Sequence, residues 1–309
     1  MTDAFLSIRP RLLALAYRML GSWAEAEDVV QETHLAWVER KGPPLESERA
    51  WLERVVTNRC LDVLKSARVT RESYVGPWLP EPMLTDDVQT PGAVDVEAVS
   101  LAFLTLLERL SPLERAVYVL AEAFDYSHDD VAKALGKEPA AVRQLLHRAR
   151  EHVSAGKPRF APDPSAHQAM LGSFFGAVLQ GDVTEVEKLL VKNATVKTDG
   201  GGKVRAAINV ITGANRVARF FIGVAQKQPP AARFEVMDVN GQPSIVMLVD
   251  DMVVGVTQIE TDGALIHGVS TVANPDKLAS LTAHVAARNH PAEVDYFRCN
   301  TGGGRFPTS

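Results

Sequence analysis

Residues 127–150 have the sequence SHDDVAKALGKEPAAVRQLLHRAR, which predicts two short helices joined by a tight turn. Ser127 is a suitable N-cap for the first helix, and Gly136 stands where a left-handed residue would end it. Pro139 fits the first turn of the second helix. Apolar residues then recur at helical spacing, so the polar and basic side chains are expected on the outer faces.

The outer faces of the second helix and its turn carry the candidates for nucleic-acid contact. A short basic helix after a glycine turn fits the major groove of DNA. The pattern is short and degenerate, so an ordinary helical hairpin with a solvated basic face is the alternative. The candidate residues are Lys137, Arg143, Gln144, His147, Arg148 and Arg150.

The composition predicts a folded protein of two or three domains, because the chain has 309 residues of which 46% are hydrophobic. The net charge is −5, so any nucleic-acid contact must come from local patches. Cys60 and Cys299 are far apart in sequence and predict neither a disulfide framework nor a zinc site. No stretch approaches the length of a membrane span, and we expect a cytoplasmic protein.

Two helices are predicted before residue 41. Gly21 ends the first, and Ser22 is a plausible N-cap for the second, which covers residues 24–40. The second helix is acidic from Glu25 to Glu32. Acidic residues in a first turn suit the helix dipole, which is the simplest explanation. A surface for a basic protein partner is the alternative.

A third helix, residues 48–69, begins a locally basic stretch in an acidic protein. Between residues 49 and 72, Arg and Lys outnumber Asp and Glu by six to three. Such a helix can follow phosphates while its polar side chains meet bases, although a solvated charged face explains the pattern equally well. The candidates are Asn58, Arg59, Asp62, Lys65 and Arg68.

Residues 76–95 are rich in Pro, Gly and acidic residues, which predicts an extended linker. Trp78 and Leu79 are unusual in a bare linker, so we expect this segment to dock on another part of the chain. The predicted divisions are a helical domain at 1–75, this linker at 76–95, a helix-turn-helix domain at 96–155, a further domain at 165–285 and a tail at 286–309.

After residue 164 the pattern changes to a mixture of helices and strands. Helices are expected at 165–180, 182–191 and 214–226, and Asn240-Gly241 and Asp262-Gly263 are hairpin turn signals. The arrangement predicts an α+β domain with a concave face. The expected strands are 194–198, 204–210, 232–239, 243–250, 252–260 and 263–273.

The order of these parts resembles the extracytoplasmic-function sigma factors of bacterial RNA polymerase. Residues 26–32, AEDVVQE, resemble the region-two segment that docks on the polymerase clamp. Residues 50–52, with the polar residues after them, resemble the segment that melts and reads the −10 element. The helix-turn-helix resembles region four, which contacts the flap and reads the −35 element. The resemblance implies polymerase contacts at Asp28, Gln31, Glu32 and Leu35.

The C-terminal extension resembles a SnoaL-like domain, as in the sigma J-type subgroup, which carries its own regulator. Three segments resemble motifs of that subgroup, and the resemblance implies that they join the extension to the linker and the sigma domains, with no separate anti-sigma factor. Glu138 departs from the family, which often has Ser at this cap position. The three segments are Trp78-Leu79-Pro80-Glu81-Pro82, Asp199-Gly200-Gly201-Gly202-Lys203 and Asn274-Pro275-Asp276-Lys277-Leu278.

The expected fold class is therefore multidomain, with two all-α sigma domains followed by an α+β SnoaL-like cone domain. The expected function is promoter-specific initiation with core RNA polymerase, without catalytic residues, metal or cofactor. One alternative is a one-component helix-turn-helix regulator with a ligand-binding domain. Another is an enzyme, for which Asp238, Asp250, Asp251 and His267 are the available residues, although the only Tyr of the domain, Tyr296, lies in the tail.

Overall fold

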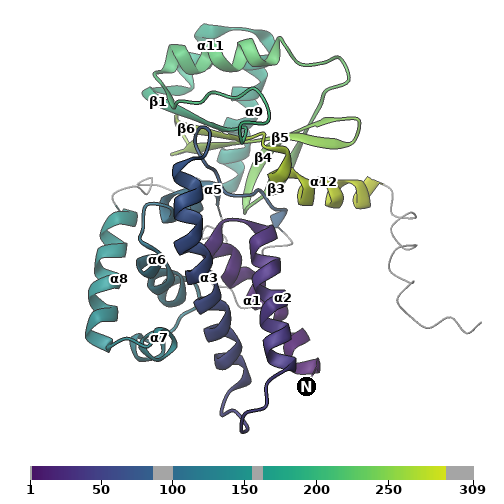
Figure 1. Ribbon diagram of the computed structural model, residues 1–309. Coiled ribbons are helices and arrows are strands. Elements are labelled where there is room, and N and C mark those ends of the chain that lie inside the picture. The colour runs from purple at the N-terminus through teal and green to yellow at the C-terminus, as the bar shows by residue number, and fades with distance from the viewer. Residues whose placement is uncertain (1, 86–99, 155–162, 290–309) are drawn as a thin grey trace, which may run out of the picture.

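The computed structural model describes residues 2–85, 100–154 and 163–289 of the chain. Figure 1 shows helices in the N-terminal half and a sheet with helices in the C-terminal half. The expected fold class is confirmed by this arrangement of elements.

The N-terminal bundle consists of α1 (Thr2–Leu20), α2 (Trp23–Val38) and α3 (Glu48–Glu72), which pack against one another. Gly21 ends α1 with a φ of 69°, a left-handed conformation that glycine adopts at little cost. The Ser22 hydroxyl accepts a hydrogen bond from the Glu25 N–H at the start of α2. Both predicted helix-end signals are confirmed.

A second group of helices contains α5 (Leu101–Leu107), α6 (Pro112–Tyr118), η2 (Val119–Ala123), α7 (His128–Leu135) and α8 (Pro139–Ser154). The capping box of Ser111 and Glu114 opens α6. The last turn before the helix-turn-helix is the π-helical η2, which the apolar spacing did not indicate. Helices α6 and α7 pack on α3, so the two helical groups share one apolar core.

The C-terminal half has helices α9 (Pro164–Gln180), α10 (Val183–Lys188), α11 (Ala214–Ala225) and α12 (Pro275–Asn289). Its strands form a sheet in the order β2-β1-β6-β5-β4-β3, in which only the β1–β6 pair is parallel. The strands are β1 (Leu190–Asp199), β2 (Ile211–Thr212), β3 (Arg233–Val239), β4 (Gln242–Val249), β5 (Met252–Thr261) and β6 (Ile266–Val272).

The two faces of this sheet have different neighbours. Helices α9, α10 and α11 cover one face with an apolar cluster. On the other face, a second cluster joins α12 to Leu79 and to Leu101 at the start of α5. The sheet therefore contacts chain segments that lie before and after residues 86–99.

One predicted strand, 204–210, is wrong. Only Ile211 and Thr212 pair with β1 there. The Ala207 backbone instead exchanges two hydrogen bonds with the Thr198 hydroxyl, at 2.7 and 3.0 Å. Val204 and Ile208 are exposed, because no neighbouring strand covers this edge of the sheet. Both predicted hairpins are confirmed, with Asn240 and Gly241 at φ values of 51° and 74°.

Residues 74–85, here called the linker segment, run between the N-terminal bundle and the sheet. Leu79 and Met83 are fully buried, and Leu84 forms an isolated antiparallel bridge with Val239 at the end of β3. The predicted docking of Trp78-Leu79 is thus confirmed for this segment. Residues 86–95 of the predicted linker and residues 96–99 of the predicted helix-turn-helix domain lie outside the described residues.

Candidate functional site

The helix-turn-helix has the predicted geometry. The Ser127 hydroxyl accepts from the Asp130 N–H, Gly136 is left-handed at φ 60° and ψ 43°, and Pro139 is the first residue of α8. Val142, with the other apolar residues of α8, faces inward. All six candidate residues of this motif are exposed.

The six candidates differ in their contacts. The Arg148 guanidinium lies 3.3 Å from the carboxylate of Glu114 in α6, and the Arg150 guanidinium lies 2.6 Å from Glu122 in η2. His147 approaches Glu151 of its own helix at 3.6 Å. Within the described part of the chain, the side chains of Lys137, Arg143 and Gln144 have no polar partner. A DNA duplex would thus compete with internal carboxylates for Arg148 and Arg150.

The candidates on α3 lie on its outer surface. Asn58, Asp62 and Lys65 are exposed, and the Lys65 ammonium lies 2.9 Å from the Asp62 carboxylate. Arg59 forms an ion pair with Glu32 of α2. Arg68 lies in α3, but its side chain is not among the described ones. The ion pair places the α2 and α3 candidates side by side.

The candidates on α2 form an exposed face that is both acidic and apolar. Asp28, Gln31 and Glu32 are exposed, and Leu35 is 57% exposed on the same helix. Val38, at the end of the helix, is 62% exposed. The helix dipole accounts for the acidic residues of the first turn, but it does not explain why two large apolar side chains are exposed on the same helix.

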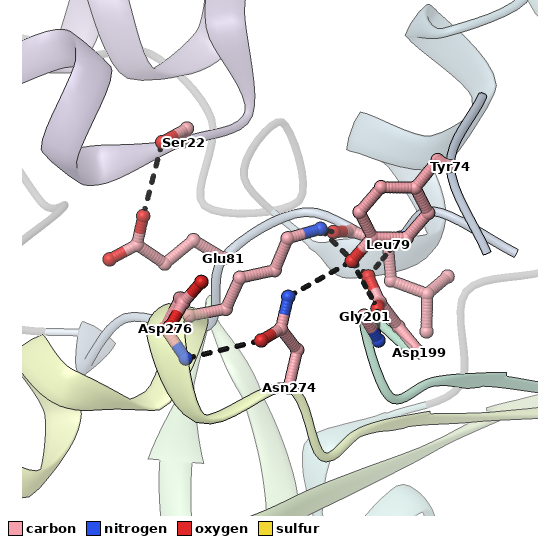
Figure 2. A network of polar contacts seen from close by, with 9 residues as sticks. Ser22, Tyr74, Leu79, Glu81, Asp199, Gly201, Asn274 and Asp276 are labelled. Carbon is pink, nitrogen blue, oxygen red and sulfur yellow. Dashed lines mark hydrogen bonds and ion pairs between the residues drawn. The ribbon is translucent and has the colours of Figure 1, made fainter. Parts of the chain in front are cut away.

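Asp199, at the end of β1, is fully buried and joins the C-terminal sheet to the linker segment (Figure 2). One carboxylate oxygen accepts from the Leu79 N–H at 2.8 Å and from the Lys277 ammonium at 2.7 Å. The other accepts from the Tyr74 hydroxyl at 2.5 Å and from the Gly201 N–H at 3.0 Å. The four donors satisfy both oxygens of the carboxylate, which offsets the cost of burying it.

Lys277, in α12, completes this network. Its ammonium donates to the Leu79 carbonyl and lies 4.0 Å from the centre of the Trp78 ring. Burial, and then the hydrogen bond to Asp199, raise the pKa of Tyr74 above its ordinary 10.0, so its hydroxyl remains a donor. Tyr74 also accepts from the Asn274 amide at 3.0 Å. The sequence did not single out Tyr74.

The remaining residues of the three motifs have supporting positions. Gly201 has a φ of 60°, and a Cβ there would clash with the Asn274 amide. Asn274 accepts from the Asp276 N–H at 3.1 Å at the start of α12. Lys203 and Asp276 form an exposed ion pair at 2.5 Å. Gly202 lies against Val75, Pro275 opens α12 at the surface, and Gly200, Pro80, Pro82 and Leu278 are buried.

Glu81 of the linker segment lies at the N-terminus of α2. One carboxylate oxygen accepts from the backbone N–H groups of Trp23 and Ala24, at 2.8 and 3.3 Å, and from the Ser22 hydroxyl at 3.2 Å. A helix N-terminus favours such an anion. Burial nevertheless raises the pKa of Glu81 above its ordinary 4.5. The linker segment thus caps the helix that carries the candidate protein-binding face.

Asn240 makes a second connection between the sheet and the bundle. Its amide donates to the Tyr17 hydroxyl of α1 at 2.6 Å and accepts from the Met83 N–H at 2.9 Å. The Tyr17 hydroxyl in turn donates to the Glu81 carbonyl at 2.6 Å. Sequence reasoning missed both contacts, because the hairpin turn alone explains Asn240 and nothing in the first predicted helix singled out Tyr17.

The residues of the enzyme alternative are not gathered into one site. Asp250 and Asp251 form the exposed β4–β5 turn, Asp238 is exposed on β3, and His267 pairs with Asp262 at the surface, 2.8 Å apart. Across residues 2–85, 100–154 and 163–289, no three His, Cys, Asp or Glu side chains are placed to hold a metal ion. In the same ranges no helix has the length and apolarity needed to span a bilayer.

Comparisons with known proteins agree with the resemblance. Residues 4–70 match the family model for sigma-70 region 2, and residues 100–153 match that for sigma-70 region 4. The chain is 39% identical over 230 residues to the ECF RNA polymerase sigma factor SigJ of Mycobacterium tuberculosis, covering 73% of each chain. It is 29% identical to the probable ECF RNA polymerase sigma factor SigI of that species, covering 90% of this chain and 94% of the relative.

The similarity extends to a solved structure. The crystal structure of M. tuberculosis SigJ superposes with a TM-score of 0.71 at 32% identity, covering 91% of this chain and 99% of that one. That coverage includes the sheet domain, so the similarity reaches well beyond the two helical regions.

Proposed function

This chain belongs to the extracytoplasmic-function sigma factors of RNA polymerase, and from that premise we propose that its C-terminal sheet domain controls initiation through the linker segment. As a family member it directs promoter-specific transcription initiation, and the family implies binding of core polymerase and promoter DNA. The homologues are regulators rather than enzymes.

The contact residues are proposed from their positions. The acidic and apolar face of α2, with Asp28, Gln31, Glu32 and Leu35, binds the polymerase clamp. The outer surface of α3 holds single-stranded −10 DNA, with Asn58 and Asp62 at bases and the cations at phosphates. The exposed face of α8, with Arg143 and Gln144 as its main contact residues, contacts the −35 element. The helix-turn-helix domain that contains α8 also binds the polymerase flap. Transcription initiation by this protein takes place in the cytoplasm.

The Asp199 network is the observation that supports C-terminal control. It joins Tyr74, which follows the proposed −10 helix α3 by two residues, and Leu79 to the sheet domain. Two residues further on, Glu81 caps the polymerase-binding helix α2. Loss of the network would weaken the attachment of the linker segment to the sheet domain and leave the Asn240 contacts with Tyr17 and Met83 as the remaining polar connection described above. In this role the sheet domain replaces a separate anti-sigma factor, and neither catalysis nor a cofactor is required.

Run-off transcription with core polymerase tests this control. We expect Asp199→Ala in the full chain to change promoter output and core affinity several-fold, and deletion of residues 165–309 to change them in the same direction. Lys203→Ala is the matched control, because it breaks an exposed ion pair within the same domain. Unchanged output and affinity in both Asp199→Ala and the deletion would refute control by the sheet domain.

A mobility-shift assay tests the sigma-factor assignment itself. Promoter DNA should be shifted specifically when core polymerase is present. Tight, sequence-specific binding of duplex DNA by the protein alone, without affinity for core polymerase, would instead indicate a one-component regulator.

A further inference from the structure

Residues 200–234 of the sheet domain form a basic stretch in an acidic chain. They contain six Lys and Arg residues and no Asp or Glu, although the net charge of the whole chain is −5. The stretch covers the loop after β1, strand β2, helix α11 and the start of β3. A local concentration of positive charge in an acidic protein is the electrostatic pattern of a surface that binds phosphates, and a solvated basic face is the alternative.

The loop of this stretch, residues 200–210, lies beside the residues that follow the proposed −10 helix α3. A Cβ built on Gly76 would lie 3.5 Å from the Cα of Ile208. One built on Gly202 would lie 3.3 Å from the Val75 side chain. Lys65, a −10 candidate on α3, precedes the end of that helix by seven residues, which is about 10 Å or about three base pairs of DNA. DNA that is bound along α3 and continues past its end would therefore meet this loop.

Large apolar side chains are exposed on the loop and on the linker segment next to it. Their exposed fractions lie between 43% and 64%. A basic face that only meets solvent has no use for them, whereas neighbouring exposed apolar side chains are typical of a contact surface. The side chains are those of Val75, Val204, Ile208 and Val210.

Three polar side chains at this edge of the sheet are available to a ligand. Arg205 and Asn209 of the loop, and Arg216 in the first turn of α11, are exposed and have no polar partner within the part of the chain that the structure describes. Helix α11 packs on β1 and β2, so Arg216 lies at the same edge as the loop. Lys203, in contrast, is paired with Asp276. Arg and Asn side chains beside small apolar ones are the combination that contacts the minor groove of DNA.

We propose that Arg205, Asn209 and Arg216, here called the basic edge, bind the promoter DNA that flanks the −10 element. The inference rests on the proposed −10 role of α3 and adds a DNA contact in the sheet domain to those of α3 and α8. The cations bind phosphates, while the exposed Val and Ile side chains pack against sugars. The basic edge is separate from the Asp199 network, which is buried and joins the sheet domain to the linker segment.

A photo-crosslinker attached to Ile208→Cys tests the contact in the full chain. Cys299→Ser removes the competing thiol, and Cys60 is buried. In the complex with core polymerase and promoter DNA, we expect crosslinks to nucleotides that flank the −10 element. Crosslinks to polymerase subunits alone would overturn the proposal and indicate a protein partner instead.

The same crosslinker on Ser66→Cys, an exposed position of α3, tests the premise separately. DNA crosslinks from α3 without any from Ile208→Cys would overturn the contact at the basic edge and leave the −10 role of α3 intact. Absence of DNA crosslinks from both positions would overturn the −10 role as well.

Salt titrations of promoter binding give the second measurement. Because each phosphate contact releases counterions, we expect Arg205→Ala and Arg216→Ala each to weaken promoter binding by the polymerase complex several-fold and to reduce the slope of log affinity against log salt by about 1. Lys227→Ala is the matched control, because Lys227 is an exposed cation of the same stretch beyond the other end of α11. Affinity for core polymerase without DNA should stay unchanged, unlike in Asp199→Ala. Slopes equal to that of the control, or a loss of core affinity, would overturn the proposal.

Discussion

The linker segment and the outer surface of α8 place polar side chains in opposite environments. At the linker segment, Asp199, Glu81 and Asn240 are nearly fully buried, and each binds several partners at fixed distances. On α8, Arg143 and Gln144 are exposed and have no polar partner in the described chain. The difference indicates that the polar contacts of the linker segment contribute to the stability of the fold, whereas the exposed residues of α8 contribute little to it and are accessible to a ligand. Substitutions should therefore separate stability from DNA binding.

The largest loss of stability is expected from Asp199→Ala. It leaves the Lys277 ammonium, whose side chain is 11% exposed, without its carboxylate. Breaking one side of a buried ion pair costs about 3–5 kcal/mol. The free energy of unfolding and hydrogen exchange at residues 74–85 measure the effect. Lys203→Ala, in an exposed pair, should cost less than about 1 kcal/mol. Equal losses in the two variants would contradict the contrast between buried and exposed pairs.

A smaller loss is expected from Asn240→Gly. Glycine tolerates the φ of 51°, so the substitution isolates the hydrogen bonds to Tyr17 and Met83. Each buried group left unsatisfied costs about 1–3 kcal/mol. Asp250→Gly is a matched control, because Asp250 has a φ of 50° in an exposed turn. Denaturant unfolding should show a loss for Asn240→Gly alone, and a similar loss in the control would point to the backbone instead.

Arg143→Ala should show the opposite behaviour. Stability should change by less than about 0.5 kcal/mol, because the side chain is exposed and has no polar partner among the residues that the structure describes. Promoter binding by the polymerase complex should weaken by about 1–3 kcal/mol at fixed salt. Arg109→Ala, another exposed arginine of the same domain, is the control. The same comparison on a promoter with a mutated −35 element locates the contact. If the affinities of wild type and Arg143→Ala become equal on that promoter, Arg143 contacts the −35 element.

The smallest effect is a pH dependence at Glu81. Burial raises its pKa above 4.5, so the docked linker segment binds the proton more tightly than the unfolded chain does. The associated stability is present below pH 4.5 and is lost as the pH rises through the raised pKa, with a slope of at most about 1.4 kcal/mol per unit. The free energy of unfolding, measured from pH 4 to 7, should therefore fall more steeply with rising pH in the wild type than in Glu81→Gln. Parallel curves would contradict it.

Local patterns were sufficient for most elements. Ser22, Ser127 and Gly136 mark helix ends, and Asn240-Gly241 marks a hairpin, because caps and turns depend on neighbouring residues. The prediction of a strand at 204–210 was wrong. Its alternating apolar residues Val204, Ile208 and Val210 are exposed, and only the two residues that follow them pair with β1. The π-helical η2 was missed because no residue type in it signals that conformation.

Contacts between distant segments were harder to predict. The three motifs predicted Asp199, Lys277 and Glu81 as contact residues but not their partners. In the structure, Asp199 and Lys277 bind Tyr74 and Leu79, and Glu81 binds the start of α2. Tyr17 fits an ordinary helix in the sequence, so nothing marked its long-range partners. The polymerase- and DNA-contacting roles of the α2, α3 and α8 residues remain predictions.

The cap that Glu81 places on α2 has a thermodynamic consequence. One segment touches both α2, the proposed polymerase-binding helix, and the sheet domain, so the control proposed above would link the occupancy of one surface to that of the other. Suppose that a small molecule binds the sheet domain, weakens its contacts with the linker segment and thereby changes the affinity for polymerase by some factor. The affinity for the small molecule must then change by the same factor when polymerase is bound. The coupling constant can therefore be measured in two ways that should agree: from the affinity for the small molecule with and without polymerase, and from the affinity for polymerase with and without the small molecule.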